Sequence, residues 1–71
     1  MEEIWNIVVM DYSCNTVTMY KEIKFQKVKE SFDAESWIVN NTDHLLSNIC
    51  WMSSMEEIEI IDGEVKEEEH E

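Results

Sequence analysis

The chain has 71 residues, which is enough for one domain and too few for two domains of about 50 residues or more each. Its formal net charge is -12. This excess of carboxylates argues against direct nucleic-acid binding and against binding to anionic membranes, because both require a surplus of Lys and Arg. The longest apolar run, residues 7–10, is far shorter than the roughly 18 residues of a membrane span.

The first 25 residues predict a β-hairpin. Residues 3–12, EIWNIVVMDY, are rich in β-branched and aromatic side chains and too short for a stable helix, which predicts a strand. Both of its faces carry apolar residues, so we expect it at the centre of the sheet. The Asp, Ser and Asn residues of DYSCNT favour a tight turn. The side chains of residues 16–25, TVTMYKEIKF, then alternate so that one face of the segment is more exposed to water than the other, which predicts a second strand.

A helix is predicted after the hairpin, beginning at Ala34. Asp33 is suited to the N-cap position, where its carboxylate can accept a hydrogen bond from a free backbone amide of the first turn. Phe32, which precedes the cap, is expected to pack against Trp37 as a hydrophobic staple. The helix should end within residues 41–46, because the sequence NNTD has poor helix propensity.

Two further apolar stretches follow the predicted helix. Residues 48–54, NICWMSS, predict a third strand. Residues 56–62, EEIEIID, alternate isoleucines with carboxylates and predict either a fourth strand or an extension of the third. Gly63 is the one glycine of the chain and ends this pattern. Residues 64–71, EVKEEEHE, contain a single apolar residue and predict a disordered acidic tail.

This order of elements predicts an α+β fold. We expect residues 1–63 to form one compact domain, a small antiparallel sheet of three to four strands with one helix on one face, in the order β-β-α-β with residues 56–62 as the optional further strand. A domain of this size buries only about 60% of the surface of its unfolded chain, so it depends on large side chains. The expected core side chains are Trp5, Trp37, Trp51, Phe25 and Phe32.

Cysteine content and the N-terminus indicate a reducing compartment. The chain has two cysteines, Cys14 and Cys50, whereas secreted domains of this size usually carry about four or more. The N-terminal sequence MEEIWNIVV lacks the basic region and the long apolar run of a signal peptide. We therefore expect a cytoplasmic protein, in which Cys50 is a small core side chain.

His44, beside Asp43, is the main candidate for acid-base or metal chemistry. No spacing such as Cys-x-x-Cys or His-x-x-x-His accompanies it, so we expect no metal site and no cofactor. Nucleophilic catalysis would need Ser13 or Cys14 held near His44 by a third group, and the chain has neither a glycine-rich phosphate loop nor a nucleophile elbow. These features predict a protein that is not an enzyme.

Charge is distributed unevenly along the chain. Residues 21–29 hold four of the five basic side chains and carry a net charge of +3, whereas residues 56–71 carry -8. The lysines are expected to be solvated residues of a sheet edge that discourage aggregation. They could equally pair with the acidic strand of a second copy, which leaves a homo-oligomer open. The acidic run has two interpretations, a solvated tail or a surface for a positively charged partner.

The partner-binding interpretation predicts a defined set of residues. Carboxylates about 6 to 7 Å apart along one face of a strand approach the spacing of phosphates on a DNA strand, so an acidic strand can occupy the basic groove of a nucleic-acid-binding protein. A tryptophan flanked by methionines would form an adaptable apolar patch before this strand. The candidate partner-binding residues are Glu56, Glu57, Glu59, Asp62, Glu64, Trp51, Met52 and Met55.

Three short stretches resemble small uncharacterised proteins of bacteria and their phages: WNIVVMDYS at residues 5–13, ESWI at residues 35–38 and WM at residues 51–52. The resemblance covers residues 5–60 and implies a compact strand-strand-helix-strand fold, with no functional residue carried over. A phage origin would favour a host-takeover or anti-defence protein.

Composition, charge and resemblance together predict a non-enzymatic acidic interaction module that binds a basic surface of a protein partner. Its most concrete form is a phage-type inhibitor that mimics nucleic acid and blocks a DNA- or RNA-binding protein. The alternative is a self-associating structural or accessory subunit whose acidic tail confers only solubility.

Overall fold

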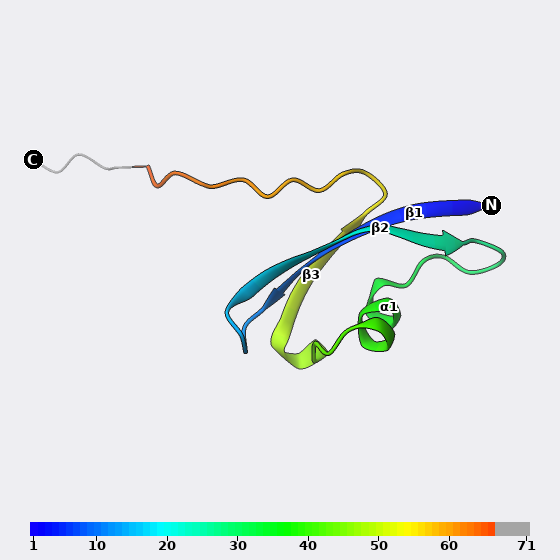
Figure 1. Cartoon of the computed structure of the whole chain (residues 1–71), viewed down its shortest axis with the longest axis horizontal. Coiled ribbons are helices and arrows are strands. Elements are labelled where there is room, and N and C mark those ends of the chain that lie inside the picture. The colour runs from blue at the N-terminus through cyan, green and yellow to red at the C-terminus, as the bar shows by residue number, and fades with distance from the viewer. Residues whose placement is uncertain (67–71) are drawn as a thin grey trace, which may run out of the picture.

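A computed structural model of the chain describes residues 1–66, in which one antiparallel sheet carries one helix on one face (Figure 1). The elements are β1 (Glu2–Asp11), β2 (Thr16–Gln26), α1 (Ala34–Asn41), a short 3-10 helix (Leu46–Asn48) and β3 (Ile49–Ser54). The strands lie in the order β2-β1-β3, so the predicted β-β-α-β order and the central position of the first strand are confirmed. No helix within residues 1–66 is long and apolar enough to cross a membrane.

An irregularity in β2 decides which of its side chains face the helix. The register between β1 and β2 shifts within residues 5–7, where β2 contributes one extra residue to the pairing. At this bulge Glu22 adopts a left-handed φ of 57°, and its amide donates a hydrogen bond to Asn6 Oδ1 at 3.2 Å. The extra residue lets Tyr20 and Ile23, three positions apart, face the same side of the sheet.

The core lies between the sheet and α1 and is aliphatic. Its buried side chains are Ile7, Val9, Ile23, Ala34 and Ile38. The aromatic residues Trp5, Tyr20, Phe32, Trp37 and Trp51 are only partly buried and pack around this cluster. The aromatic side chains therefore shield the core instead of filling it, because a helix of eight residues covers too little of the sheet to enclose them.

The ends of α1 are capped by side chains. Asp33 is the N-cap that the sequence predicted, since its carboxylate accepts hydrogen bonds from Ser36 N at 3.3 Å and Ser36 Oγ at 3.0 Å. The helix ends at Asn41, within the predicted range. Thr42 closes it, with its amide and its hydroxyl both donating to Ile38 O, at 3.0 and 2.7 Å.

Aromatic contacts attach α1 to the two longer strands. Phe32 stacks on Trp5 of β1 with ring centroids 4.8 Å apart and meets Phe25 of β2 edge to face at 5.4 Å. Trp37 meets Tyr20 of β2 edge to face at 5.3 Å. Phe32 and Trp37, which were expected to pack on each other, thus each contact a ring on the sheet.

The predicted fourth strand does not form, and β3 ends at Ser54. The side-chain amide of Asn6 donates to Glu56 O at 3.0 Å, and Glu56 N donates to Ser54 Oγ at 3.0 Å, which turns the chain away from the edge of β3. Pairing back onto that edge would require a tight turn directly after Ser54. The one glycine of the chain stands at position 63, beyond the segment that would have to pair.

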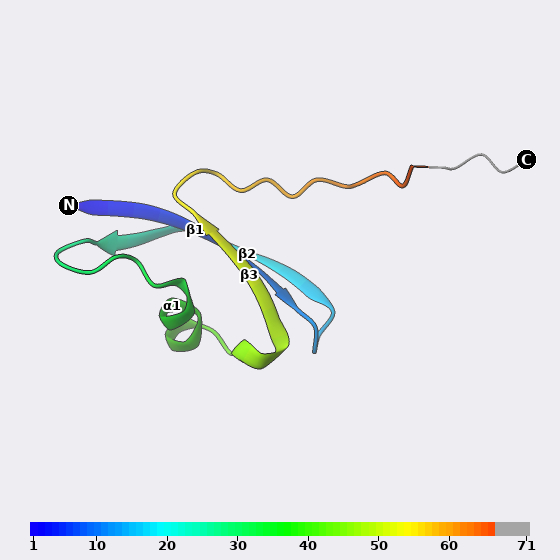
Figure 2. The ribbon, with the colours of Figure 1, turned by 180° about the vertical axis from the view of Figure 1, so that it is seen from behind.

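We call residues 56–66 the acidic arm. Figures 1 and 2 show it leaving the sheet on the side opposite α1. Ile58 is its only buried residue, and it lines a shallow depression together with Met19 and Lys21. Of the predicted tail, residues 64–66 are exposed and have no regular secondary structure, and residues 67–71 lie outside the described part of the chain.

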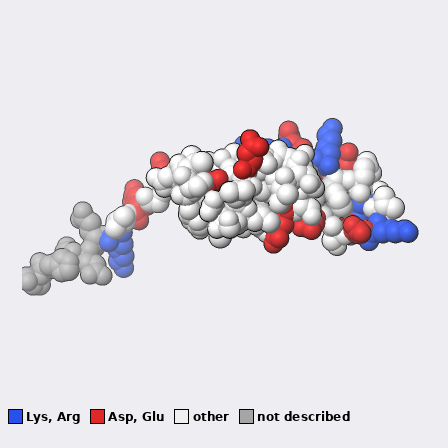
Figure 3. Space-filling view, turned by 90° about the horizontal axis from the view of Figure 1, so that it is seen from below, with Lys and Arg blue, Asp and Glu red and all other residues white. Residues whose placement is uncertain are grey.

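Most of the lysines lie away from the acidic arm, although Lys66 belongs to it and Lys21 lines the same depression as Ile58. Lys21 and Lys24 are exposed on β2, which is an edge strand as predicted for them, and Lys27 and Lys29 follow in the next loop. Lys27 Nζ lies 3.9 Å from Glu3 Oε2. Figure 3 shows most of the basic side chains toward the end of the molecule opposite to the arm, so the folded chain has a charge asymmetry along its length.

Replacing Ile38 by Val should lower the free energy of unfolding by about 0.5–1.5 kcal/mol, because a methylene group is removed from a fully buried site. Val39, exposed on the same helix, provides the control, and Val39→Ala should change this free energy by less than about 0.5 kcal/mol. Urea unfolding followed by circular dichroism measures both. Equal effects at the two positions would contradict the placement of Ile38 in the core.

Glu22→Gly should leave the free energy of unfolding unchanged or raise it by up to about 1 kcal/mol, because glycine adopts a φ of 57° without strain. Lys24→Gly in the same strand should lower it by about 0.5–1 kcal/mol, since that residue has ordinary strand geometry. The same unfolding measurement compares the two variants. An equal loss in both would show that Glu22 is not strained in the bulge.

Candidate functional site

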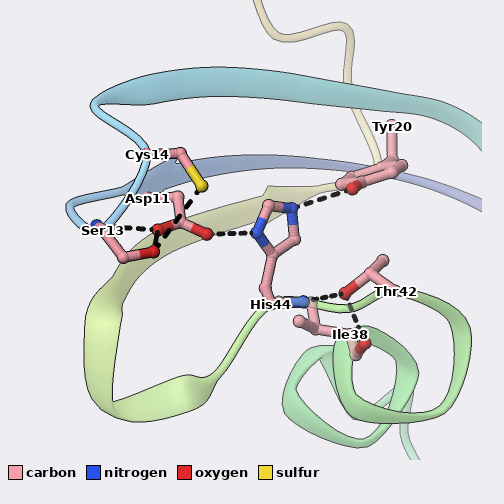
Figure 4. Close-up of polar contacts among 7 residues, drawn as sticks. All are labelled: Asp11, Ser13, Cys14, Tyr20, Ile38, Thr42 and His44. Atoms are coloured by element: carbon pink, nitrogen blue, oxygen red, sulfur yellow. Dashed lines mark hydrogen bonds and ion pairs between the residues drawn. The ribbon is translucent and has the colours of Figure 1, made fainter.

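A polar network connects the end of β1 to the loop that follows α1 (Figure 4). Asp11 ends β1 on the side of the sheet that carries Ile7 and Val9, and it is only 5% exposed. His44 is positioned in the loop by its amide, which donates to Thr42 Oγ1 at 3.3 Å. His44 Nδ1 lies 2.6 Å from Asp11 Oδ2. This hydrogen bond joins the loop after α1 to strand β1.

The carboxylate of Asp11 determines where the proton of His44 lies. An ionised carboxylate only accepts hydrogen bonds, so Nδ1 of His44 carries a proton and donates a hydrogen bond to Asp11. In the neutral imidazole, Nε2 then accepts from the hydroxyl of Tyr20, 2.9 Å away. Three segments, β2, the loop after α1 and β1, are thereby joined through one imidazole ring.

Ser13 satisfies the second oxygen of the Asp11 carboxylate. Its amide and its hydroxyl donate to Asp11 Oδ1 at 2.9 and 2.6 Å. The hydrogen bonds from Ser13, followed by the one from His44, lower the pKa of Asp11 from 3.8 to about 2. The carboxylate is therefore ionised at neutral pH, and hydrogen bonds replace the water that the fold removes from it.

The network forms a wall of an open pocket of about 390 Å³, which Cys14, Asp43 and His44 help to line. A nucleophilic site needs a hydroxyl or thiol beside the base. Here the hydroxyl of Ser13 bonds to Asp11, and Nε2 of His44 faces the phenol of Tyr20. The arrangement orients the imidazole, and the hydroxyl of Ser13 bonds to Asp11 and not to His44. Within residues 1–66, no three His, Cys, Asp or Glu side chains converge as a metal site.

Sequence reasoning associated His44 with its neighbour Asp43, whereas the structure pairs it with Asp11, 33 positions away. A signal for this pairing is present in the sequence. Ile7, Val9 and Asp11 occupy every second position of the strand, so the Asp11 carboxylate lies on the core face, where it requires a hydrogen-bond partner. Tyr20 was not a predicted site residue, although the register of the hairpin pairs it with Ile7 and so places it on the same face.

The predicted acidic residues lie together on the arm. Ile58, which lies between them in the sequence, is only 9% exposed, and its burial fixes the beginning of the arm against the sheet. The carboxylate residues that surround it and follow it are all exposed: Glu56, Glu57, Glu59, Asp62 and Glu64. Among the described residues none of these five forms an ion pair. The arm therefore presents unpaired negative charge to solvent from one anchored position.

The predicted apolar patch is divided between the two faces of the sheet. Met52 and Met55 are 51% and 53% exposed. Trp51 is half-buried and packs against the core on the helix side. Neighbouring strand residues point to opposite faces, so Trp51 and Met52 do not share one surface. Cys50, which was expected in the core, is exposed on the same face as its pairing partner Met10 for the same reason.

Comparisons of the chain with protein-family models, with curated proteins and with solved structures find no match. Two candidate sites are defined by the geometry itself. One is the polar network of Asp11, His44 and Tyr20, and the other is the acidic arm with the sheet surface beside it.

Asp11→Asn should remove an acid-sensitive part of the stability. The pKa of Asp11 is lowered in the folded protein, so the ionised carboxylate stabilises the fold above pH about 4, and this contribution is lost as the pH falls toward about 2. The difference in unfolding free energy between the wild type and the variant should shrink as the pH falls below about 4. Urea unfolding at a series of pH values measures it.

Tyr20→Phe is the control for this experiment, because it leaves the Asp11 carboxylate and both bonds from Ser13 in place. The acid-sensitive part of the stability should persist in this variant. A difference between wild type and Asp11→Asn that stays constant down to pH about 2 would contradict the role assigned to the Asp11 carboxylate.

Proposed function

We propose that the protein is a non-enzymatic binding module of the cytoplasm whose acidic arm engages a basic surface on a partner protein. The observation that carries the proposal is the combination of five exposed arm carboxylates, unpaired within residues 1–66, with the buried Ile58. A segment that only confers solubility needs no such anchor. A binding segment benefits from one, because a fixed starting point reduces the conformational entropy lost on association.

A basic groove that normally holds nucleic acid is the partner surface that fits the arm best. Alternate residues of an extended chain, such as Glu57 and Glu59, stand about 6 to 7 Å apart, which is about twice the axial rise between phosphates of one DNA strand. The arm lies outside the sheet, so it would adopt this spacing along the groove of its partner. In this role the protein is an inhibitor that competes with DNA or RNA.

The geometry around His44 supports the non-enzymatic part of the proposal. Its two ring nitrogens bond to Asp11 and Tyr20, and both groups belong to strands of the sheet. These contacts are of the kind that hold a loop in place. The network therefore has a structural explanation that requires no substrate.

Reversing charge on the arm should abolish capture of the partner. Full-length protein immobilised on a column is exposed to a lysate of the cell in which it acts, and bound proteins are eluted with a salt gradient. The wild type should retain a basic protein that duplex DNA displaces. Glu57→Lys/Glu59→Lys should lose it, whereas Glu2→Lys/Glu30→Lys, which changes the net charge equally at exposed sites outside the arm, should retain it.

The same experiment separates the proposal from its alternative. Equal loss in both charge-reversed variants would mean that only the total charge matters. Recovery of the same partners by residues 1–63 and by Glu57→Lys/Glu59→Lys would show that the arm is a solubilising segment. The self-associating subunit would then replace the binding module as the function.

A further inference from the structure

The face of the sheet opposite α1, which we call the open face, is apolar and exposed. Strand pairing places Val8, Met10, Val17, Met19 and Met52 on this face. Met10, Val17 and Met52 are 39%, 56% and 51% exposed, whereas Met19 is half-buried and Val8, in the central strand, is buried. All five positions are uncharged although the chain carries a net charge of -12. A group of exposed apolar side chains on one rigid surface is typical of a site that another element covers.

The acidic arm covers only part of the open face. Asn6 points to this face, and its bond to Glu56 O carries the arm across β1. Ile58 is buried outside the core cluster and lines one depression with Met19 and Lys21, so it packs at the β2 side of the open face. Beyond this point the arm diverges from the sheet, as Figures 1 and 2 show. The hairpin end of the open face is left uncovered.

The charges at the border of the open face specify what can cover it. Glu57 and Glu59 line the same depression as Ile58 and outnumber Lys21 there, and further carboxylates follow along the arm. Lys24 pairs with Ile4 at the other end of the face, away from the hairpin. An element that covers the hairpin end therefore meets apolar side chains beneath it and carboxylates along one border. It requires one apolar side and basic residues next to that side.

A helix meets both requirements. On the other face of the same sheet α1 already packs through Ala34 and Ile38, so the surface of this sheet accommodates a helix. An amphipathic helix carries an apolar stripe flanked by charged residues. Methionine side chains adapt to the varied shapes of such stripes, and three of the five open-face residues are methionines.

We propose that the open face is a docking site for a basic amphipathic helix of a partner protein. The apolar stripe of this helix packs on Met10, Val17 and Met52, and its Lys and Arg side chains face the acidic arm. The inference rests on the proposed function, because the arm supplies the charge that selects a basic partner. It adds the apolar half of the binding surface and the secondary structure of the ligand.

Calorimetric titration of the full-length protein with three synthetic peptides tests this docking site. The first is a helical peptide with leucines along one side and lysines along the other. The second has the same composition in an order that scatters the leucines, and the third is oligolysine of the same charge. We expect saturable one-to-one binding of the first peptide and binding of the other two that is at least about tenfold weaker.

Matched variants locate the binding surface. Met10→Gln/Met52→Gln should weaken binding of the amphipathic peptide about tenfold, because it removes apolar area from the open face without changing charge. Leu45→Gln/Leu46→Gln, at exposed leucines outside the open face, should change the affinity by about twofold at most. Glu57→Lys/Glu59→Lys should weaken the binding of all three peptides. Circular dichroism verifies that each variant is folded.

Three other outcomes would contradict the proposed docking site. Equal binding of the three peptides with no effect of the methionine variant would leave only the arm as a binding element, so the proposed function would stand alone. Binding of none of the peptides at low salt would contradict both proposals. If light scattering shows a wild-type dimer that the methionine variant dissociates, a second copy of the chain covers the open face instead of a partner helix.

Discussion

Strand β1 lies between β2 and β3 and pairs with both, so its alternating side chains serve two different layers of the molecule. On one side Ile7 and Val9 enter the core, and Asp11 continues the same row to the polar network. On the other side Asn6 contacts both the bulge of β2 and the beginning of the acidic arm. The two candidate sites are therefore both positioned by side chains of this one strand.

The polar network compensates for the small size of the core. The buried cluster consists of five aliphatic side chains, and the loop after α1 contributes none of them. That loop is held instead by His44, whose two nitrogens reach Asp11 and Tyr20. A hydrogen bond to an ionised carboxylate is about twice as strong as one between neutral groups. A domain below about 70 to 80 residues gains from such connections, because its apolar surface alone supplies little stability.

A single helix also explains why the molecule has two unlike faces. Packing of α1 uses one face of the sheet, no second helix forms within residues 1–66, and the acidic arm covers only part of the other face. The open face consequently keeps methionine and valine side chains in contact with solvent, and the acidic arm runs out beside it. Apolar and negatively charged surfaces thus lie next to each other. This combination suits the proposed ligand, which is both apolar and basic.

Local patterns were sufficient to predict much of the fold. The strands, the cap at Asp33 and the exposure of the arm carboxylates depend on residues close together in the sequence, so alternation, capping and charge reveal them. The bulge at Glu22 has no such signature, since the residue is neither Gly nor Asn, yet it determines that Tyr20 and Ile23 share a face.

The sequence by itself determined an α+β domain with a strongly acidic end, because composition and periodicity are properties of short segments. Only the tertiary structure decided that His44 binds Asp11, that Trp51 lies on the helix side of the sheet, and that residues 56–62 form no strand. Each of these outcomes depends on strand register and on contacts between distant residues. Such contacts exist only after β1 has paired with both of its neighbours in one register, and a short segment does not specify that register.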